Sequence, residues 1–187
     1  MNDLIARLKD SGVNFSYGLS GDEILIAEKA YGFHFPPDLR ELLSIAIPVD
    51  LKPKEKRIFP DWRNIHDPYT QKMIDWPMSS LKFDVEENDF WLKFLGEKPD
   101  NKDSQLEILR AAFDRAPRLI PICSHRFLPE LPRESGNPVV SFWQPSDIIY
   151  YGVDLEDYFS VEFCGKKSMS TGRNIKKIDF WSDVIVS

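Results

Sequence analysis

The hydrophobic pattern changes near Pro117, and this change constrains the fold more than any other feature of the sequence. Before it, apolar residues recur at intervals of three and four, as in an amphipathic helix over residues 104–116. After it come short apolar or β-branched runs, at residues 119–122, 139–143 and 148–151, separated by turn residues. Helices followed by neighbouring strands predict an α+β fold with an antiparallel sheet. At 187 residues the chain is close to one domain, so we expect a single domain over 1–187.

Residues 20–47 predict a helical hairpin with a tight elbow. Ser20 and Glu23 have the spacing of a capping box, and Gly32 is placed to end the first helix in a left-handed conformation. Pro37 suits the first position of the second helix, where its missing N–H costs nothing. Apolar side chains then recur along one side of that helix, which predicts a core-facing stripe: Leu39, Leu42, Leu43 and Ala46.

The remaining segments complete the expected arrangement. A short helix is predicted at residues 2–9, and a closing helix at residues 155–163. Residues 61–76 suggest a further helix, although Pro68 argues against one continuous element, and residues 83–95 fit either helix or strand. The tail is apolar enough to dock back onto the fold. Most tryptophans are expected in the core, with Trp62 as the exposed one because polar residues surround it.

Three motifs in this order resemble the SUKH superfamily, the group of Smi/Knr-like cell-wall-assembly regulators and bacterial toxin-immunity proteins. The elbow from Glu28 to Pro36 is similar to the family pattern E-x-x-x-G-hydrophobic-x-hydrophobic-P. The run Leu119-Ile120-Pro121-Ile122 resembles the family's L-I-P-I strand, and Tyr150-Tyr151-Gly152 precedes an acidic and aromatic closing helix. The resemblance covers roughly residues 20–163, and within the family the chain is most similar to an uncharacterised bacterial subgroup. It implies a helical hairpin packed on an antiparallel sheet with further helices around it.

The resemblance also implies a function. A SUKH-like domain is expected to be a non-catalytic protein-binding module. In the bacterial subgroup this means a toxin-immunity role, in which an acidic surface blocks a basic effector such as a nuclease. The formal net charge of −6 agrees with a basic protein partner and argues against a dedicated duplex-DNA binder. We therefore expect no direct contact with nucleic acid.

Composition limits the compartment and the chemistry. No apolar run reaches membrane-spanning length, and the charged start lacks the apolar stretch of a signal peptide, so a cytoplasmic protein without membrane contact is expected. The two cysteines, Cys123 and Cys164, are expected as reduced thiols. No pair of histidines or cysteines has the spacing of a metal site, so no cofactor or metal is expected.

An acidic cluster within residues 83–90 is the first candidate binding site: Asp84, Glu86, Glu87 and Asp89. Phe83 and Phe90 lie at its ends, so the segment offers both charge and aromatic surface to a basic partner. A cation site or an acid/base pair is a second interpretation, but the segment lacks the spacing and glycine of an EF-hand loop. A merely solvated face is the third.

The second candidate follows the strand predicted at residues 119–122. His125 and Arg126, with Asn137 opposite, would form a polar pocket for a small ligand or an enzyme's substrate. In the structural alternative, Arg126 pairs with Glu130 or Glu134 and His125 caps a loop. Cys123 and His125 are two residues apart, so on a strand they would share a face, the geometry a Cys–His nucleophile requires.

Residues 165–177 carry five basic residues and no acidic one. Such a segment would meet a phosphate, RNA or an acidic partner. The alternative is a solvated loop, because single-strand binding also needs stacking aromatics and this segment has none.

Overall fold

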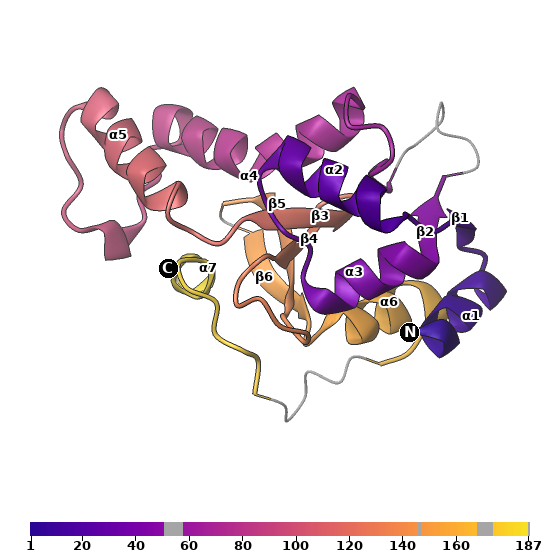
Figure 1. The fold of residues 1–187 in the computed structure, drawn as a ribbon. Coiled ribbons are helices and arrows are strands. Elements are labelled where there is room, and N and C mark those ends of the chain that lie inside the picture. The colour runs from indigo at the N-terminus through magenta and orange to yellow at the C-terminus, as the bar shows by residue number, and fades with distance from the viewer. Residues whose placement is uncertain (51–57, 146, 168–173, 187) are drawn as a thin grey trace.

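A four-stranded antiparallel sheet with helices on both faces forms the centre of the molecule. The computed structural model describes residues 1–50, 58–145, 147–167 and 174–186. The sheet order is β3-β4-β5-β6, with these bounds: β3 (Leu119–Cys123), β4 (Arg126–Pro129), β5 (Val139–Gln144) and β6 (Asp147–Gly152). Figure 1 shows α1 and α5 toward opposite ends of the molecule. The predicted α+β class is confirmed.

The helical hairpin and the closing helix cover one face of this sheet: α2 (Gly21–Tyr31), α3 (Pro37–Ile45) and α6 (Leu155–Cys164). The stripe predicted on α3 is buried against the strands, as expected from its spacing. Its neighbours in one apolar cluster come from both helices and strands, and include Ile24, Ala27, Ile120, Ile122, Leu128 and Phe159.

Three other helices cover the opposite face: α4 (Pro68–Glu87), α5 (Lys102–Phe113) and α7 (Trp181–Ile185). Their core includes Leu81, Val85, Leu109, Phe127, Val140, Phe142, Ile178 and Trp181. Alternation along β4 explains the division, because Phe127 faces this cluster and Leu128 faces the hairpin. The tail docks back as predicted, through Ile178 and Trp181.

The elbow between α2 and α3 forms as its sequence predicts. Ser20 and Glu23 make both hydrogen bonds of the capping box, and Gly32 ends α2 with a φ of 71°. Glu28 is the acidic residue of the elbow motif, and its contacts explain why a carboxylate is needed there. Its buried carboxylate accepts hydrogen bonds from the Phe35 backbone N–H at 3.0 Å and from Arg40 at 2.7 Å. One side chain therefore joins the end of α2 to the start of α3.

We expect Glu28→Ala to lower the free energy of unfolding by about 2–3 kcal/mol, because the buried N–H of Phe35 loses its charged acceptor. Urea denaturation followed by circular dichroism measures the change. Lys29→Ala, which removes an exposed neighbouring side chain, is the matched control and should stay within about 0.5 kcal/mol. A loss of the same size in both variants would contradict a specific role for Glu28.

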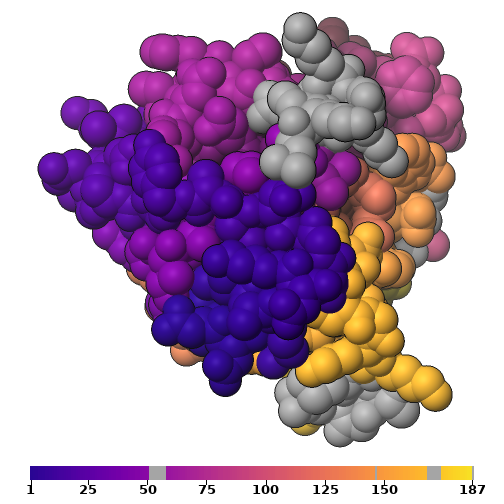
Figure 2. Space-filling model, turned by 90° about the vertical axis from the view of Figure 1, so that its right-hand side faces the viewer, coloured from indigo at the N-terminus to yellow at the C-terminus, as the bar shows by residue number. Residues whose placement is uncertain are grey.

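A two-stranded antiparallel sheet was not predicted from the sequence. It pairs β1 (Asn14–Tyr17) with β2 (Ala46–Val49). The expected second helix of the hairpin therefore ends at Ile45, and Ala46 and Ile47 belong to a strand. Before β1, α1 (Asn2–Asp10) packs beside α6 (Figure 2). Arg7 of α1 pairs with Glu156 of α6 at 2.8 Å.

Helix α4 corrects two expectations about the middle of the chain. It begins at Pro68, which takes the first helical position, with Asp67 as the N-cap, so residues 61–67 are not helical. The helix contains Pro77 and ends at Glu87, within the ambiguous segment 83–95. The short 3₁₀ helix η1 (Lys93–Leu95) lies near the end of that segment. Trp62 is buried among aromatic rings rather than exposed. Its polar sequence neighbours lie at the surface, while the indole fills the hairpin core.

Candidate functional site

His125 lies in a hollow between α4 and the sheet, with a volume of about 240 Å³. Ser124 and His125 form the two-residue turn between β3 and β4, with Ser124 at a φ of 51°. The His125 ring contacts Trp143 edge-on at 5.0 Å between centroids. We call this feature the aromatic hollow, and its lining comes from α4, the turn and the sheet: Tyr69, Lys72, Met73, Trp76, Ser124, His125, Phe127 and Trp143.

Arg126 does not share the aromatic hollow with His125. It is the first residue of β4 rather than part of a loop, and successive strand side chains point to opposite faces. Its strand neighbour Phe127 lines the hollow, so Arg126 points to the other face. There its guanidinium lies over the Tyr151 ring at 4.0 Å and donates to the Ser141 hydroxyl at 3.0 Å. The expected pairs do not form, because Glu130 pairs with Arg133 and Glu134 with Lys176.

Asn137 is also separate, so the three residues do not make the single polar pocket expected from the sequence. Its side chain is fully buried, and its Nδ2 donates to the carbonyl oxygens of Pro129 at 3.0 Å and Pro132 at 2.8 Å. Its Oδ1 accepts from Lys176 at 3.1 Å. With these groups engaged, Asn137 stabilises the loop before β5.

Cys123 does not pair with His125. The register shifts between Pro121 and Cys123, and Cys123 packs in the hairpin-side core while His125 lines the aromatic hollow on the other face. Burial raises the pKa of the Cys123 thiol to about 12. The thiolate is the nucleophilic form, and at neutral pH this cysteine stays protonated.

The acidic cluster divides between core and surface. Asp84 lies on the buried side of α4 and accepts a hydrogen bond from the Asn88 side chain at 2.6 Å. It is therefore not available to a partner, contrary to the expectation from the sequence. Asp89 is exposed and pairs with Lys98, and this hydrogen bond lowers its pKa. Glu86 and Glu87 are exposed on the last turn of α4.

Exposed and half-buried side chains along one side of α4 connect the two candidate regions. Residues seven positions apart lie on one side of a helix, so Trp76 and Phe83 share a side, and Glu87 follows Phe83 by four positions. Phe83 is 57% exposed. We call this side the α4 flank, and it runs from the aromatic hollow to the acidic end of the helix: Tyr69, Lys72, Trp76, Phe83 and Glu87.

Trp143 adds to this surface from β5. It is 55% exposed, and its carbonyl oxygen accepts the indole N–H of Trp76 at 3.2 Å. Sequence reasoning placed most tryptophans in the core and missed this one. The available signal was its position next to the end of a strand, just before the polar residues that begin with Gln144.

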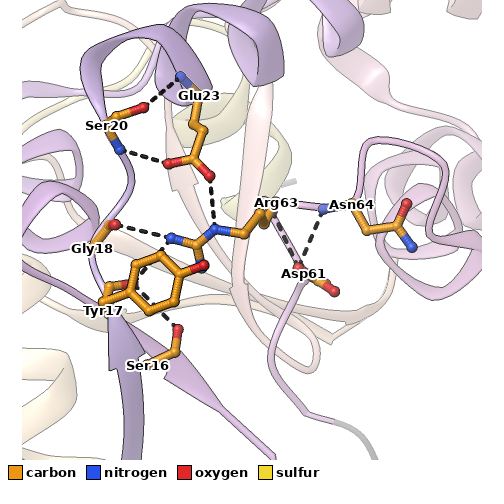
Figure 3. A network of polar contacts seen from close by, with 8 residues as sticks. All are labelled: Ser16, Tyr17, Gly18, Ser20, Glu23, Asp61, Arg63 and Asn64. Carbon is orange, nitrogen blue, oxygen red and sulfur yellow. Dashed lines mark hydrogen bonds and ion pairs between the residues drawn. The ribbon is translucent and has the colours of Figure 1, made fainter.

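A larger groove of about 640 Å³ lies beside β2. The polar side chains Arg63 and Asp61, which line it, are engaged in hydrogen bonds that stabilise the fold. Arg63 donates to the Glu23 carboxylate at 2.8 Å and the Gly18 carbonyl at 2.9 Å (Figure 3). Asp61 accepts from the backbone N–H groups of Arg63 and Asn64. The hydrogen bonds from the Ser20 N–H and Arg63 lower the pKa of Glu23.

Lys176 and Lys177 attach the C-terminal end of the basic segment to the fold, while Lys166 and Lys167 at its other end are exposed. Lys176 pairs with Glu134 at 2.8 Å in addition to its bond to Asn137, and Lys177 pairs with Asp183 at 3.5 Å. These contacts correct the expectation of a wholly solvated loop at this end. The rest of that expectation, over residues 168–173, lies outside the described residues.

No cluster of three or more His, Cys, Asp or Glu suited to a metal ion occurs among the described residues. Within the same residues, no helix has the length and apolar character needed to span a membrane. Comparison of the chain with protein-family models, curated proteins and solved structures returned no significant match.

Proposed function

We propose that this protein is a non-catalytic binding domain that acts in the cytoplasm by blocking a basic protein, with a toxin nuclease domain as the expected partner. The resemblance to the SUKH group motivates the immunity role, and the net charge of −6 favours a basic partner. The partner contacts the α4 flank and the neighbouring Trp143.

The exposure of large aromatic side chains beside one another carries this proposal. Phe83 and Trp143 are each more than half exposed, and Trp76 lies between them along the same surface. Aromatic residues are enriched at protein interfaces and dominate their binding energy, because each buries a large area with few rotatable bonds. The flank therefore offers several anchors within one strip of surface.

The acidic end of the α4 flank supplies the charge. Glu86 and Glu87 are exposed beside Phe83, and Glu86 has only a loose i,i+4 pair with Lys82 at 3.7 Å. Exposed pairs of this kind contribute little, so both carboxylates remain available to a basic partner. Attraction between opposite charges raises the association rate and weakens as salt increases.

We expect Glu86→Lys combined with Glu87→Lys to weaken partner binding at least tenfold while leaving the fold intact, because both attraction sites become repulsive. Co-expression with toxin domains encoded beside this gene identifies the partner, and calorimetry at two salt concentrations measures the affinity. The matched control is Asp3→Lys with Asp10→Lys, the same change of charge at exposed positions on α1.

Two outcomes contradict the proposal. One is protection by the Glu86 and Glu87 double variant at the level of the unchanged protein. The other is a normally folded Cys123→Ala or His125→Ala protein that loses activity while the charge-reversed protein retains it, which favours an enzyme.

A further inference from the structure

The aromatic hollow is bounded by flat rings on two sides. Tyr69 and Trp76 come from α4, and His125 and Trp143 come from the sheet side. Met73 and Phe127, both buried, lie beneath them. A hollow lined by several aromatic rings suits an aromatic occupant, because aromatic pairs gain from stacked or edge-to-face contact beyond the area they bury.

The size of the hollow favours a single side chain. Its volume of about 240 Å³ is below the range of roughly 300–1,000 Å³ in which proteins hold cofactors and drug-sized ligands. Interface hot spots, in contrast, consist of one anchor side chain in a desolvated pocket. The volume is therefore better matched to one residue of a partner than to a free small molecule.

Lys72 is the charged side chain at the hollow, and it disfavours an anchor of positive charge. The indole N–H of Trp76 is already bonded to the Trp143 carbonyl, which leaves its ring for contact. The Lys72 ammonium repels an Arg or Lys that enters the hollow. The acidic groups that attract a basic partner lie at the other end of the α4 flank, at Glu86 and Glu87.

From these contacts we infer that the aromatic hollow is a socket for one aromatic side chain, Phe, Tyr or Trp, of the protein partner. This inference rests on the proposed function, since it takes the partner to be a protein. It also orients that partner: its basic surface meets Glu87 and Phe83, and its aromatic anchor enters beside Trp143. Opposite charges at the two ends of the flank disfavour the reversed arrangement.

Side-chain analogues test the socket without the partner. Indole and p-cresol represent Trp and Tyr, and n-propylguanidinium represents Arg. Each is titrated into the ¹⁵N-labelled full chain and followed by the indole N–H signals of Trp76 and Trp143. We expect saturable shifts with indole and p-cresol, localised to the hollow. With n-propylguanidinium we expect saturation at no less than a fivefold higher concentration.

Two variants locate the binding. Trp143→Ala removes one wall but keeps the backbone carbonyl that holds Trp76, and it should weaken indole binding at least fivefold. Tyr17→Ala is the control, because this exposed aromatic lies outside the hollow and its removal should leave the affinity for indole unchanged. Unchanged shifts of the Trp62 and Trp181 indole signals verify that each variant is folded.

The inference is overturned if indole gives no saturable shift, if Trp143→Ala leaves its affinity unchanged, or if n-propylguanidinium binds as tightly as indole. The outcome is separable from that of the proposed function, which depends on protection and on Glu86 and Glu87. A protein that protects through its acidic end but does not bind indole keeps the function and loses the socket. A protein that binds indole but protects after charge reversal at both glutamates loses the proposed function.

Discussion

Replacing Gly18 by Ala is expected to lower the free energy of unfolding by about 3 kcal/mol or more. A Cβ at this position would lie 2.0 Å from the backbone carbonyl oxygen of Ser44 and 2.8 Å from the carbonyl carbon of Ile45. Both contacts are with backbone, so no side-chain rotation relieves them, and the end of β1 must separate from the end of α3. Guanidinium unfolding at equilibrium measures the loss.

Gly21→Ala is the matched control for this variant. Gly21 is the first residue of α2, and a Cβ there meets no atom within 4 Å. We expect it to be neutral or to stabilise the protein by less than about 1 kcal/mol, because Ala restricts the unfolded chain more than Gly does. Similar midpoints for the two variants would show that the close approach of Gly18 to α3 is incorrect.

Trp181→Ala is expected to cost about 3–5 kcal/mol, the usual range for removing a large buried aromatic side chain. Trp181 is 0% exposed, and its ring packs edge-on against Phe113 and Phe142. Its indole N–H donates to the carbonyl of Pro117 at 2.7 Å, and truncation leaves that buried acceptor without its donor. Thermal and urea unfolding should both show the loss.

Val186→Ala provides the comparison, since Val186 is 80% exposed near the end of the same helix. We expect a change within about 0.5 kcal/mol. If Trp181→Ala were equally mild, the C-terminal segment would not be part of the core that includes Phe142. Neither substitution alters an α4 flank side chain, so both test the fold separately from the proposed interface.

Much of the fold could be predicted from local patterns. The capping box at Ser20, the left-handed Gly32 and the stripe through Leu42 depend on residues within a few positions of one another, and all three are present in the structure. The hairpin of β5 and β6 follows from the turn residues between the apolar runs at residues 139–143 and 148–151. Such features depend on backbone geometry that neighbouring residues determine directly.

Pairings between distant segments were not predicted, because they depend on which surfaces meet. Strands β1 and β2 are only four residues each and are separated by the whole hairpin, so neither shows a strong alternation of its own. The start of α4 was misplaced for a related reason. Pro68 reads as a helix breaker when the helix is assumed to begin earlier, and as a helix starter once Asp67 is its cap.

The sequence by itself determined the α+β class, the hairpin and the overall charge, since these follow from periodicity, capping and composition. Only the tertiary structure decided which candidate residues share a surface. His125 lines the aromatic hollow from a turn, while Arg126, the first residue of β4, contacts Tyr151 on the other face. Asp84 and Asn137 are buried, and helix packing places Trp76 beside Trp143. The physical reason is that exposure and proximity depend on how elements pack against one another, and residues close in sequence can point to opposite faces.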